Sequence, residues 1–290
     1  MVRSGASYAA AFLLGGVILL VLLGFQWTGL PFTPEAQFSD SATSHFPNAL
    51  FLRATVLTMR EFPVWRETIM AGAPFAANPL NKTAYPLQWL ALIFPPAQHL
   101  NVLLLLHMAI AAAGMWRWTR LLGVSRPASA FAALAYTFSP RLVAHAGAGH
   151  LDIVYAMAWL PWLMQSAYKF GCVPKLSTVL QFSLFAGLLI LSDVRISLFG
   201  YGAAGVYALA GMRGHVRRSL LWVIAVGVVW LLLAFSVLAP RVGWSPFLSR
   251  SALSLADTGV FSLEPGNFIG VMLPGITGNV EMLVYVGLPT

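Results

Sequence analysis

Long apolar runs recur along the whole chain and limit the folds that it can adopt. They cover residues 8–27, 100–118, 128–143, 153–168, 176–191, 196–211 and 220–239, and an eighth run begins at Met282. Several of them approach the roughly 20 residues that an α-helix needs to cross a bilayer. Charged residues make up only 9% of the 290 residues, which leaves too little polar surface for a water-soluble globule. The sequence therefore predicts an all-α polytopic membrane protein with about seven transmembrane helices and the start of an eighth.

The charged residues between these runs predict an orientation. If the N-terminus lies in the cytoplasm, the inner side collects nine cations and no acid, and all nine carboxylates fall outside with the other eight cations. Cations in short loops follow the positive-inside rule, whereas acids contribute little to it. The location of all the acids on one side therefore indicates chemistry on the outer face. Each basic cluster adjoins an apolar run, so we interpret the net charge of +8 as contact with anionic lipid and expect no nucleic acid partner.

The first outer segment, residues 30–98, is the largest break between apolar runs. Helical spacing mixed with several prolines predicts short amphipathic helices lying on the membrane surface. Asp40 is the strongest catalytic candidate in this loop. A carboxylate held at the membrane interface is partly desolvated, which raises its basicity and suits it to take a proton from an acceptor hydroxyl. The plainer alternative is that Asp40 caps the helix that follows it.

Basic side chains that the topology places on the outer face predict a phosphate site. Arg141, Arg195 and Lys82, together with Arg241, would form a collar, because guanidinium groups match phosphate oxygens bidentately; we add His150 to this set. The alternative for Arg195 is an ion pair with the neighbouring Asp193. His145, His150 and Asp152 in HAGAGHLD match no specific zinc spacing. We therefore predict no metal ligands, and a divalent cation as cofactor stays open.

A series of short motifs carries a family resemblance. The segments SDSATSHFPNALFLR, FPVWRETIMAGAPFAANP, YPLQWLALIFP and WRWTRLLGVSRPASAFAALAYTFSPRLVAHAGAGH, with FSLEPGNFIGVMLPG and YVGLP further on, resemble the bacterial YfhO-like membrane proteins of the GT-C glycosyltransferase type. The resemblance implies transfer of a sugar from a polyprenyl-phosphate donor to a cell-envelope acceptor at the outer face. It also implies an acid in the first outer loop as the base, and Asp40 is the residue that matches.

These observations predict one transmembrane domain, residues 1–290, with the extracytoplasmic loop 30–98 inside it. Because the family's chains have more helices after this point, we expect the 290 residues to be the N-terminal part of a longer GT-C module. The expected partners are the bilayer, the lipid-linked donor and a glycopolymer, lipid or protein acceptor. Two alternatives remain open: a transporter or flippase of a lipid-linked saccharide, and a non-catalytic subunit of envelope assembly.

Overall fold

A computed structural model describes residues 39–69, 71–212 and 216–247, together with Gly16, Gly29, Leu30 and Ser254, and no side chains for 216–218. Eight α-helices lie in this part of the chain. They are α2 (Phe46–Ala54), α3 (Pro96–Leu121), α4 (Arg126–Thr137), α5 (Pro140–Ala148), α6 (Leu151–Cys172), α7 (Leu176–Ser192), α8 (Val194–Gly211) and α9 (Val216–Trp244). The all-α class that the sequence predicts is confirmed.

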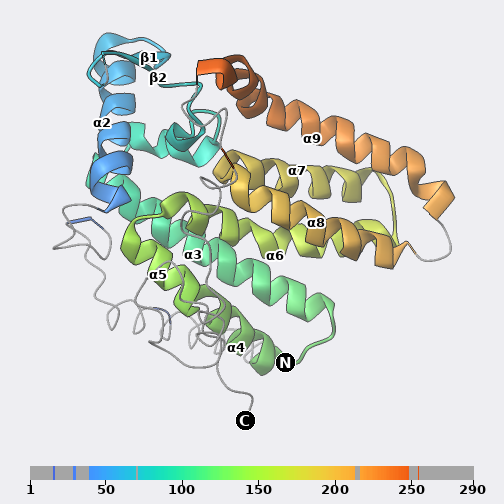
Figure 1. The fold of residues 1–290 in the computed structure, drawn as a ribbon. Coiled ribbons are helices and arrows are strands. Elements are labelled where there is room, and N and C mark those ends of the chain that lie inside the picture. The colour runs from blue at the N-terminus through green and yellow to red at the C-terminus, as the bar shows by residue number, and fades with distance from the viewer. Residues whose placement is uncertain are drawn as a thin grey trace.

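The long helices form a bundle around α6 (Figure 1). Helix α6 packs against α3, α7 and α8, while α4 packs on α3 and α9 packs on α7. The largest core cluster lies between α6, α7 and α8 and includes Leu163, Phe170 and Leu189, each at most 1% exposed. At the contact between α3 and α6 the close approach requires a glycine, because a Cβ on Gly114 of α3 would lie 2.5 Å from the indole nitrogen of Trp162 in α6.

Short elements cover one end of the bundle, which we call the loop end. Helix α2 runs across this end (Figure 1), between the π-helical turns η1 (Ser41–His45) and η2 (Thr55–Met59). A two-stranded antiparallel hairpin follows, formed by β1 (Trp65–Arg66) and β2 (Ala73–Pro74). Two 3₁₀ helices, η3 (Pro79–Asn81) and η4 (Pro86–Leu92), lead into α3, and a third, η5 (Ser245–Phe247), follows α9. The short helices of residues 30–98 were predicted, but the hairpin was not.

Prolines determine where several helices begin. Proline occupies one of the first two positions of α3, α4 and α5, where its missing N–H leaves no hydrogen bond unmade. Pro140 also explains why the single helix predicted over 128–143 is wrong. The structure has α4 and α5 there instead, separated at Phe138 and Ser139, because a proline disfavours helical geometry in the residue before it.

Two helical stretches of the described chain are long and apolar enough to cross a membrane. They are Pro96–Leu121 and Ser219–Phe247, and α7 is apolar but shorter. Apart from Gly16, the predicted run at 8–27 lies outside the described residues, and so does the eighth run that begins at Met282. The observed helices α3, α6, α7, α8 and α9 contain the apolar runs predicted for them.

Candidate functional site

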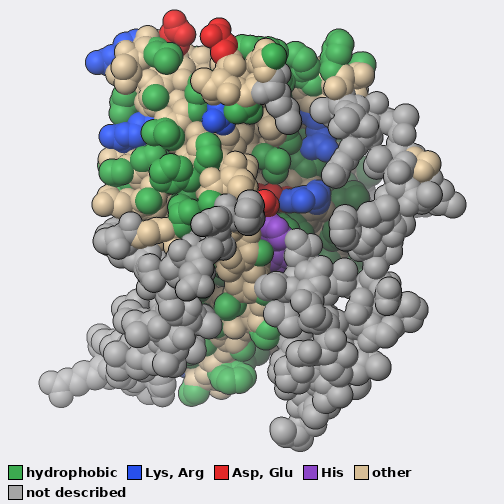
Figure 2. All heavy atoms as spheres, turned by 60° about the vertical axis from the view of Figure 1, so that its left-hand side comes forward, with side chains coloured by type: hydrophobic (Ala, Val, Ile, Leu, Met, Phe, Trp, Pro, Cys, Tyr) green, Lys and Arg blue, Asp and Glu red, His purple; other side chains and the backbone are tan. Residues whose placement is uncertain are grey.

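Charged and histidine side chains from distant parts of the sequence meet at the loop end. Figure 2 shows acidic, basic and histidine side chains next to one another near the middle of one face, with further acidic side chains at its upper rim. The members come from η1 and the turn before it, from the α5–α6 junction and from the α7–α8 junction; they are Asp40, His45, His145, His150, Asp152, Asp193 and Arg195. We call this set the loop-end cluster.

Arg195 joins two buried carboxylates. Its Nη2 lies 2.6 Å from Oδ2 of Asp152 and 2.7 Å from Oδ2 of Asp193, and its Nε also donates to Asp193. The Asp193 side chain in addition accepts from the backbone N–H groups of Arg195 and Ile196, which makes it the N-cap of α8. The ion pair predicted between Arg195 and Asp193 is present, and Asp152 extends it to a second helix.

Lys82 is a buried neighbour of these carboxylates. Its side chain is only 3% exposed, and its ammonium donates to the carbonyl of Leu80. Burial lowers the pKa of Lys82, and the negative charges of Asp152 and Asp193 act in the opposite direction. Lys82 therefore balances charge inside the cluster, and it is not a surface cation of the predicted collar.

His45 is buried inside the protein. It is 9% exposed, and its Nε2 lies 3.8 Å from Oδ1 of Asp152, which is too long for a hydrogen bond. Burial lowers the pKa of His45 well below its ordinary value, and the positive charge of Lys82 and the neighbouring His150 lower it further. His45 is therefore a neutral imidazole near neutral pH.

Asp40 lies at the open edge of the cluster. Its carboxylate is 54% exposed, and its Oδ2 lies 3.5 Å from Nε2 of His150. The Nδ1 of His150 in turn lies 3.0 Å from Nδ1 of His145. Asp40 occupies the N-cap position of η1, but its side chain makes no capping hydrogen bond. The alternative interpretation of Asp40 as a helix cap is therefore not what the structure shows.

Gly149 holds Asp40 against His150. It ends α5 with a left-handed φ of 85°, a conformation that other residues adopt only with strain. A Cβ at this position would lie 2.4 Å from the backbone nitrogen of Ser41 and 2.9 Å from that of Asp40. Only a glycine therefore lets the turn before α6 contact the turn that carries Asp40.

A cavity of about 480 Å³ opens beside the cluster. Arg195 and Arg241 line it, together with Asp152, Asp193, Trp244 and loop residues between 73 and 80. The Arg195 side chain is 64% exposed, and its hydrogen bonds use Nε and Nη2. Its Nη1 makes no hydrogen bond with the described residues. The cavity is therefore lined by two arginines, one of which has an Nη1 that bonds to none of the described residues.

Arg141 lies apart from this cavity. It lines an open groove of about 500 Å³ whose other walls are mainly apolar side chains of α3, α6 and α8, among them Met115, Met164 and Phe199. The groove also contains Ile196, the residue that follows Arg195. The structure thus brings Asp40, His150, Arg195 and Lys82 together, and it places Arg141 in a groove that begins next to them.

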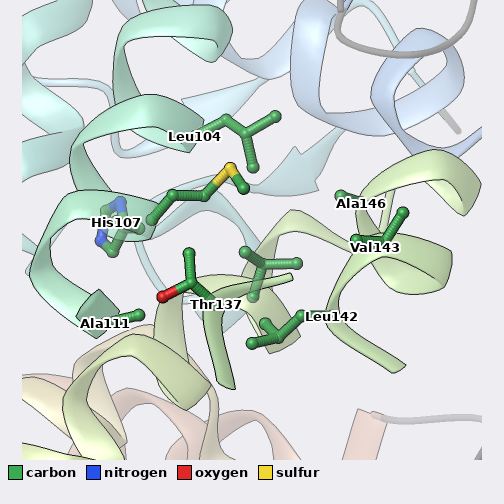
Figure 3. Close-up of a pocket in the computed structure, with 9 residues that line it drawn as sticks. Leu104, His107, Ala111, Thr137, Leu142, Val143 and Ala146 are labelled. Carbon is green, nitrogen blue, oxygen red and sulfur yellow. The ribbon is translucent and has the colours of Figure 1, made fainter. Parts of the chain in front are cut away.

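A smaller cavity inside the bundle is a packing defect and not a ligand site. The side chains in Figure 3 come from α3, α4, α5 and α6, and all are apolar except the ring of His107 and the hydroxyl of Thr137. Its volume of about 10 Å³ is close to that of a single water. Both ring nitrogens of His107 already have hydrogen-bond partners: Nδ1 bonds to the carbonyl of Leu103, and Nε2 bonds to the hydroxyl of Tyr85.

The sequence pointed to the loop end but missed part of the cluster. Asp152 was considered with His145 and His150 as a metal ligand, and nothing in the pattern showed that it shares Arg195 with Asp193. The glycine-rich spacing of HAGAGH was the available signal for Gly149. Within the described residues, no group of three or more His, Cys, Asp or Glu side chains is arranged to hold a metal ion.

Comparisons with protein-family models, with curated proteins and with solved structures find no match for the chain. The resemblance to YfhO-like proteins therefore remains a proposal.

Proposed function

We propose that the chain belongs to a multi-pass membrane glycosyltransferase of the GT-C type, which moves a sugar from a polyprenyl-phosphate donor to an envelope acceptor. The observation that carries this proposal is the position of Asp40. Its half-exposed carboxylate lies beside His150 at the same end of the bundle as the cavity lined by Arg195 and Arg241. A base and a phosphate-binding pair are the two groups that such a transfer requires.

The exposed apolar helix faces support a membrane location. Leu198, Phe199, Leu221 and Leu232 on α8 and α9 are each more than 70% exposed, and exposed apolar surface of this extent is typical of contact with lipid. With the N-terminus in the cytoplasm, the loop end faces outward. The loop-end cluster would then lie at the outer membrane interface, as the distribution of acids suggested.

The proposed reaction needs one proton transfer and one bond exchange. The acceptor hydroxyl oxygen bonds to the anomeric carbon of the sugar, and its proton passes to the carboxylate of Asp40. The bond between that carbon and the phosphate oxygen breaks, and its electron pair leaves with the polyprenyl phosphate. His150 orients Asp40, while Arg195 and Arg241 stabilise the negative charge that develops on the leaving phosphate.

The charges around Arg195 support a role in binding an anion. Asp152 and Asp193 are offset by Lys82 and Arg195, so this group of four is neutral in sum. Arg241 and Nη1 of Arg195, which bonds to none of the described residues, are the groups we assign to a ligand. The apolar groove lined by Arg141 would accept the hydrocarbon chain of the donor.

The test is transfer of labelled sugar from polyprenyl-phosphate donors to envelope acceptors in membranes that contain the protein. We expect Asp40→Asn to lower transfer by about 100-fold or more, because it removes the base and keeps the shape. The matched control is Glu61→Gln, an exposed acid of the same loop outside the cluster, which should transfer at the unsubstituted rate.

The other outcomes separate the alternatives. Equal transfer by Asp40→Asn and the unsubstituted protein would remove Asp40 from the mechanism. Movement of a lipid-linked saccharide across the bilayer without transfer would favour the transporter.

A further inference from the structure

A second pocket of the loop end has a different chemistry from the arginine-lined cavity. It has a volume of about 300 Å³ and lies between η1 and α2 on one side and the β1–β2 hairpin on the other. Its polar lining consists of hydroxyl and amide groups with one cation: Thr43, Ser44, Asn48, Asn78, Asn81 and Arg66. No carboxylate lines it among the described residues. We call it the amide pocket.

The lining of the amide pocket suits a neutral ligand rich in hydroxyl groups. Hydroxyl and amide side chains both donate and accept hydrogen bonds, and so match sugar hydroxyls, which do the same. Pro47, Ile69 and Phe75 add apolar walls for the C–H faces of a sugar ring. The volume is at the lower end of the roughly 300–1,000 Å³ of small-molecule sites. A phosphate bound in this pocket would contact one cation, Arg66, whereas two arginines line the neighbouring cavity.

Hydrogen bonds fix the polar groups of this pocket in place. Arg66 donates through Nη1 to Oδ1 of Asn48 at 2.8 Å, and its guanidinium lies over the ring of Phe51. Asn81 is 5% exposed, and its Nδ2 donates to the carbonyl of Phe75. A site whose side chains are already ordered loses less conformational entropy when a ligand binds.

The position of the amide pocket relates it to the proposed chemistry. Thr43 and Ser44 follow Asp40 by three and four residues in one helical turn, a spacing that brings side chains to the same side of a helix. Ala73, Pro74 and Asn78 line both this pocket and the arginine-lined cavity. The two sites therefore share a wall, and Asp40 lies at the start of the turn that lines one of them.

We propose that the amide pocket binds the saccharide part of the acceptor. That the bound sugar is the acceptor rests on the proposed function, whereas sugar binding itself does not. The pocket holds the acceptor near Asp40, while the phosphate of the donor occupies the arginine-lined cavity.

The experiment measures binding of cellobiose, gentiobiose and lactose to the full chain in lipid nanodiscs by saturation-transfer NMR. At least one sugar should give a signal, and Asn48→Leu should reduce it at least fivefold by removing the amide at constant size. Ser44→Phe is a second variant, which fills the pocket without removing the Asn48–Arg66 contact. Thr58→Leu is the matched control, since Thr58 is exposed on the same loop and does not line the pocket.

The readouts separate this inference from the proposed function. Absence of signal from all three sugars, or signals that survive in both pocket variants, overturns the amide pocket as a saccharide site. If the unsubstituted protein binds a sugar and both variants lose that binding, the amide pocket is upheld as a saccharide site. If the same protein shows no transfer activity, the proposed transferase function is rejected. Where transfer occurs, Asn48→Leu should raise the acceptor KM and leave kcat unchanged, whereas Asp40→Asn lowers kcat.

Discussion

Two carboxylates of the loop-end cluster, each beside a basic side chain, differ in burial, in contact distance and in helix capping. Asp193 is 2% exposed in its side chain, bonds to Arg195 at 2.7 Å and caps α8. Asp40 is 54% exposed, lies 3.5 Å from His150 and caps nothing. The first pair is structural, because it caps α8 and Arg195 also bonds to Asp152 of α6. The second leaves a carboxylate free to exchange a proton, which is why we place the chemistry at Asp40.

Removal of Asp193 should give the largest loss of stability. Asp193→Ala breaks the pair with Arg195 and leaves the first N–H groups of α8 without an acceptor, so we expect the free energy of unfolding to fall by about 3 kcal/mol. Chemical unfolding in detergent micelles measures this. Glu61→Ala, an exposed acid, should stay within about 0.5 kcal/mol of the unsubstituted protein. Equal effects of the two substitutions would contradict the structural role of Asp193.

Gly149→Ala should affect both stability and transfer, because it disturbs the contact that positions Asp40. The new methyl group would meet the backbone of Ser41, and the left-handed φ adds strain, so we expect a loss of about 1–3 kcal/mol. Transfer should fall with it. Gly147→Ala is the matched control, two residues earlier in α5 with no atom within 4 Å of the added Cβ. If both variants transfer sugar equally well, the positioning of Asp40 by Gly149 is wrong.

Acidification should weaken the buried side of the cluster. Burial, Lys82 and His150 lower the pKa of His45 below 6.5, so the unfolded chain binds a proton at a higher pH than the folded protein. The neutral imidazole of His45 therefore contributes fully to the free energy of unfolding above pH 6.5, and this contribution decreases as the pH falls below 6.5. Between pH 7 and pH 5 we expect the Tm to fall by about 2–4 °C. The decrease in Tm should be smaller in His45→Gln than in the unsubstituted protein. An equal decrease in the two proteins would show that other groups cause it.

Asp40→Asn should have the smallest effect on stability. The side chain is half exposed and makes no capping bond, so the free energy of unfolding should change by less than about 0.5 kcal/mol. Unfolding and transfer measured on the same preparation check this. A stability loss as large as that of Asp193→Ala would show that Asp40 is a structural residue and would remove the contrast between the pairs.

The sequence predicted the helices well because their signal is local. Apolar runs and flanking cations located α3, α6, α7, α8 and α9, although the predicted ends differ by several residues at some helices. The break before Pro140 was missed, because the apolar composition continues across it. The hairpin was missed for a related reason, since two residues per strand are too few to show an alternating pattern.

The candidate site could be predicted only in part, because its contacts join distant residues. The distribution of charges indicated an outer face for all nine carboxylates, and Asp40 was singled out among them. The burial of Lys82 depends on how the loop folds over the α7–α8 junction, which no local pattern encodes. Lys82 also has a left-handed backbone, with φ of 54°, which is uncommon for a residue other than glycine.

The wall shared by the amide pocket and the arginine-lined cavity has a consequence for ligands. Ala73, Pro74 and Asn78 belong to both linings, so a ligand that displaces this segment from one side changes the space available on the other. If occupancy of one cavity alters affinity in the other by some factor, thermodynamic reciprocity requires the same factor in reverse. The order in which two ligands arrive then leaves the free energy of the doubly occupied protein unchanged. The direction in which the first ligand moves the shared wall determines whether the second binds more or less tightly.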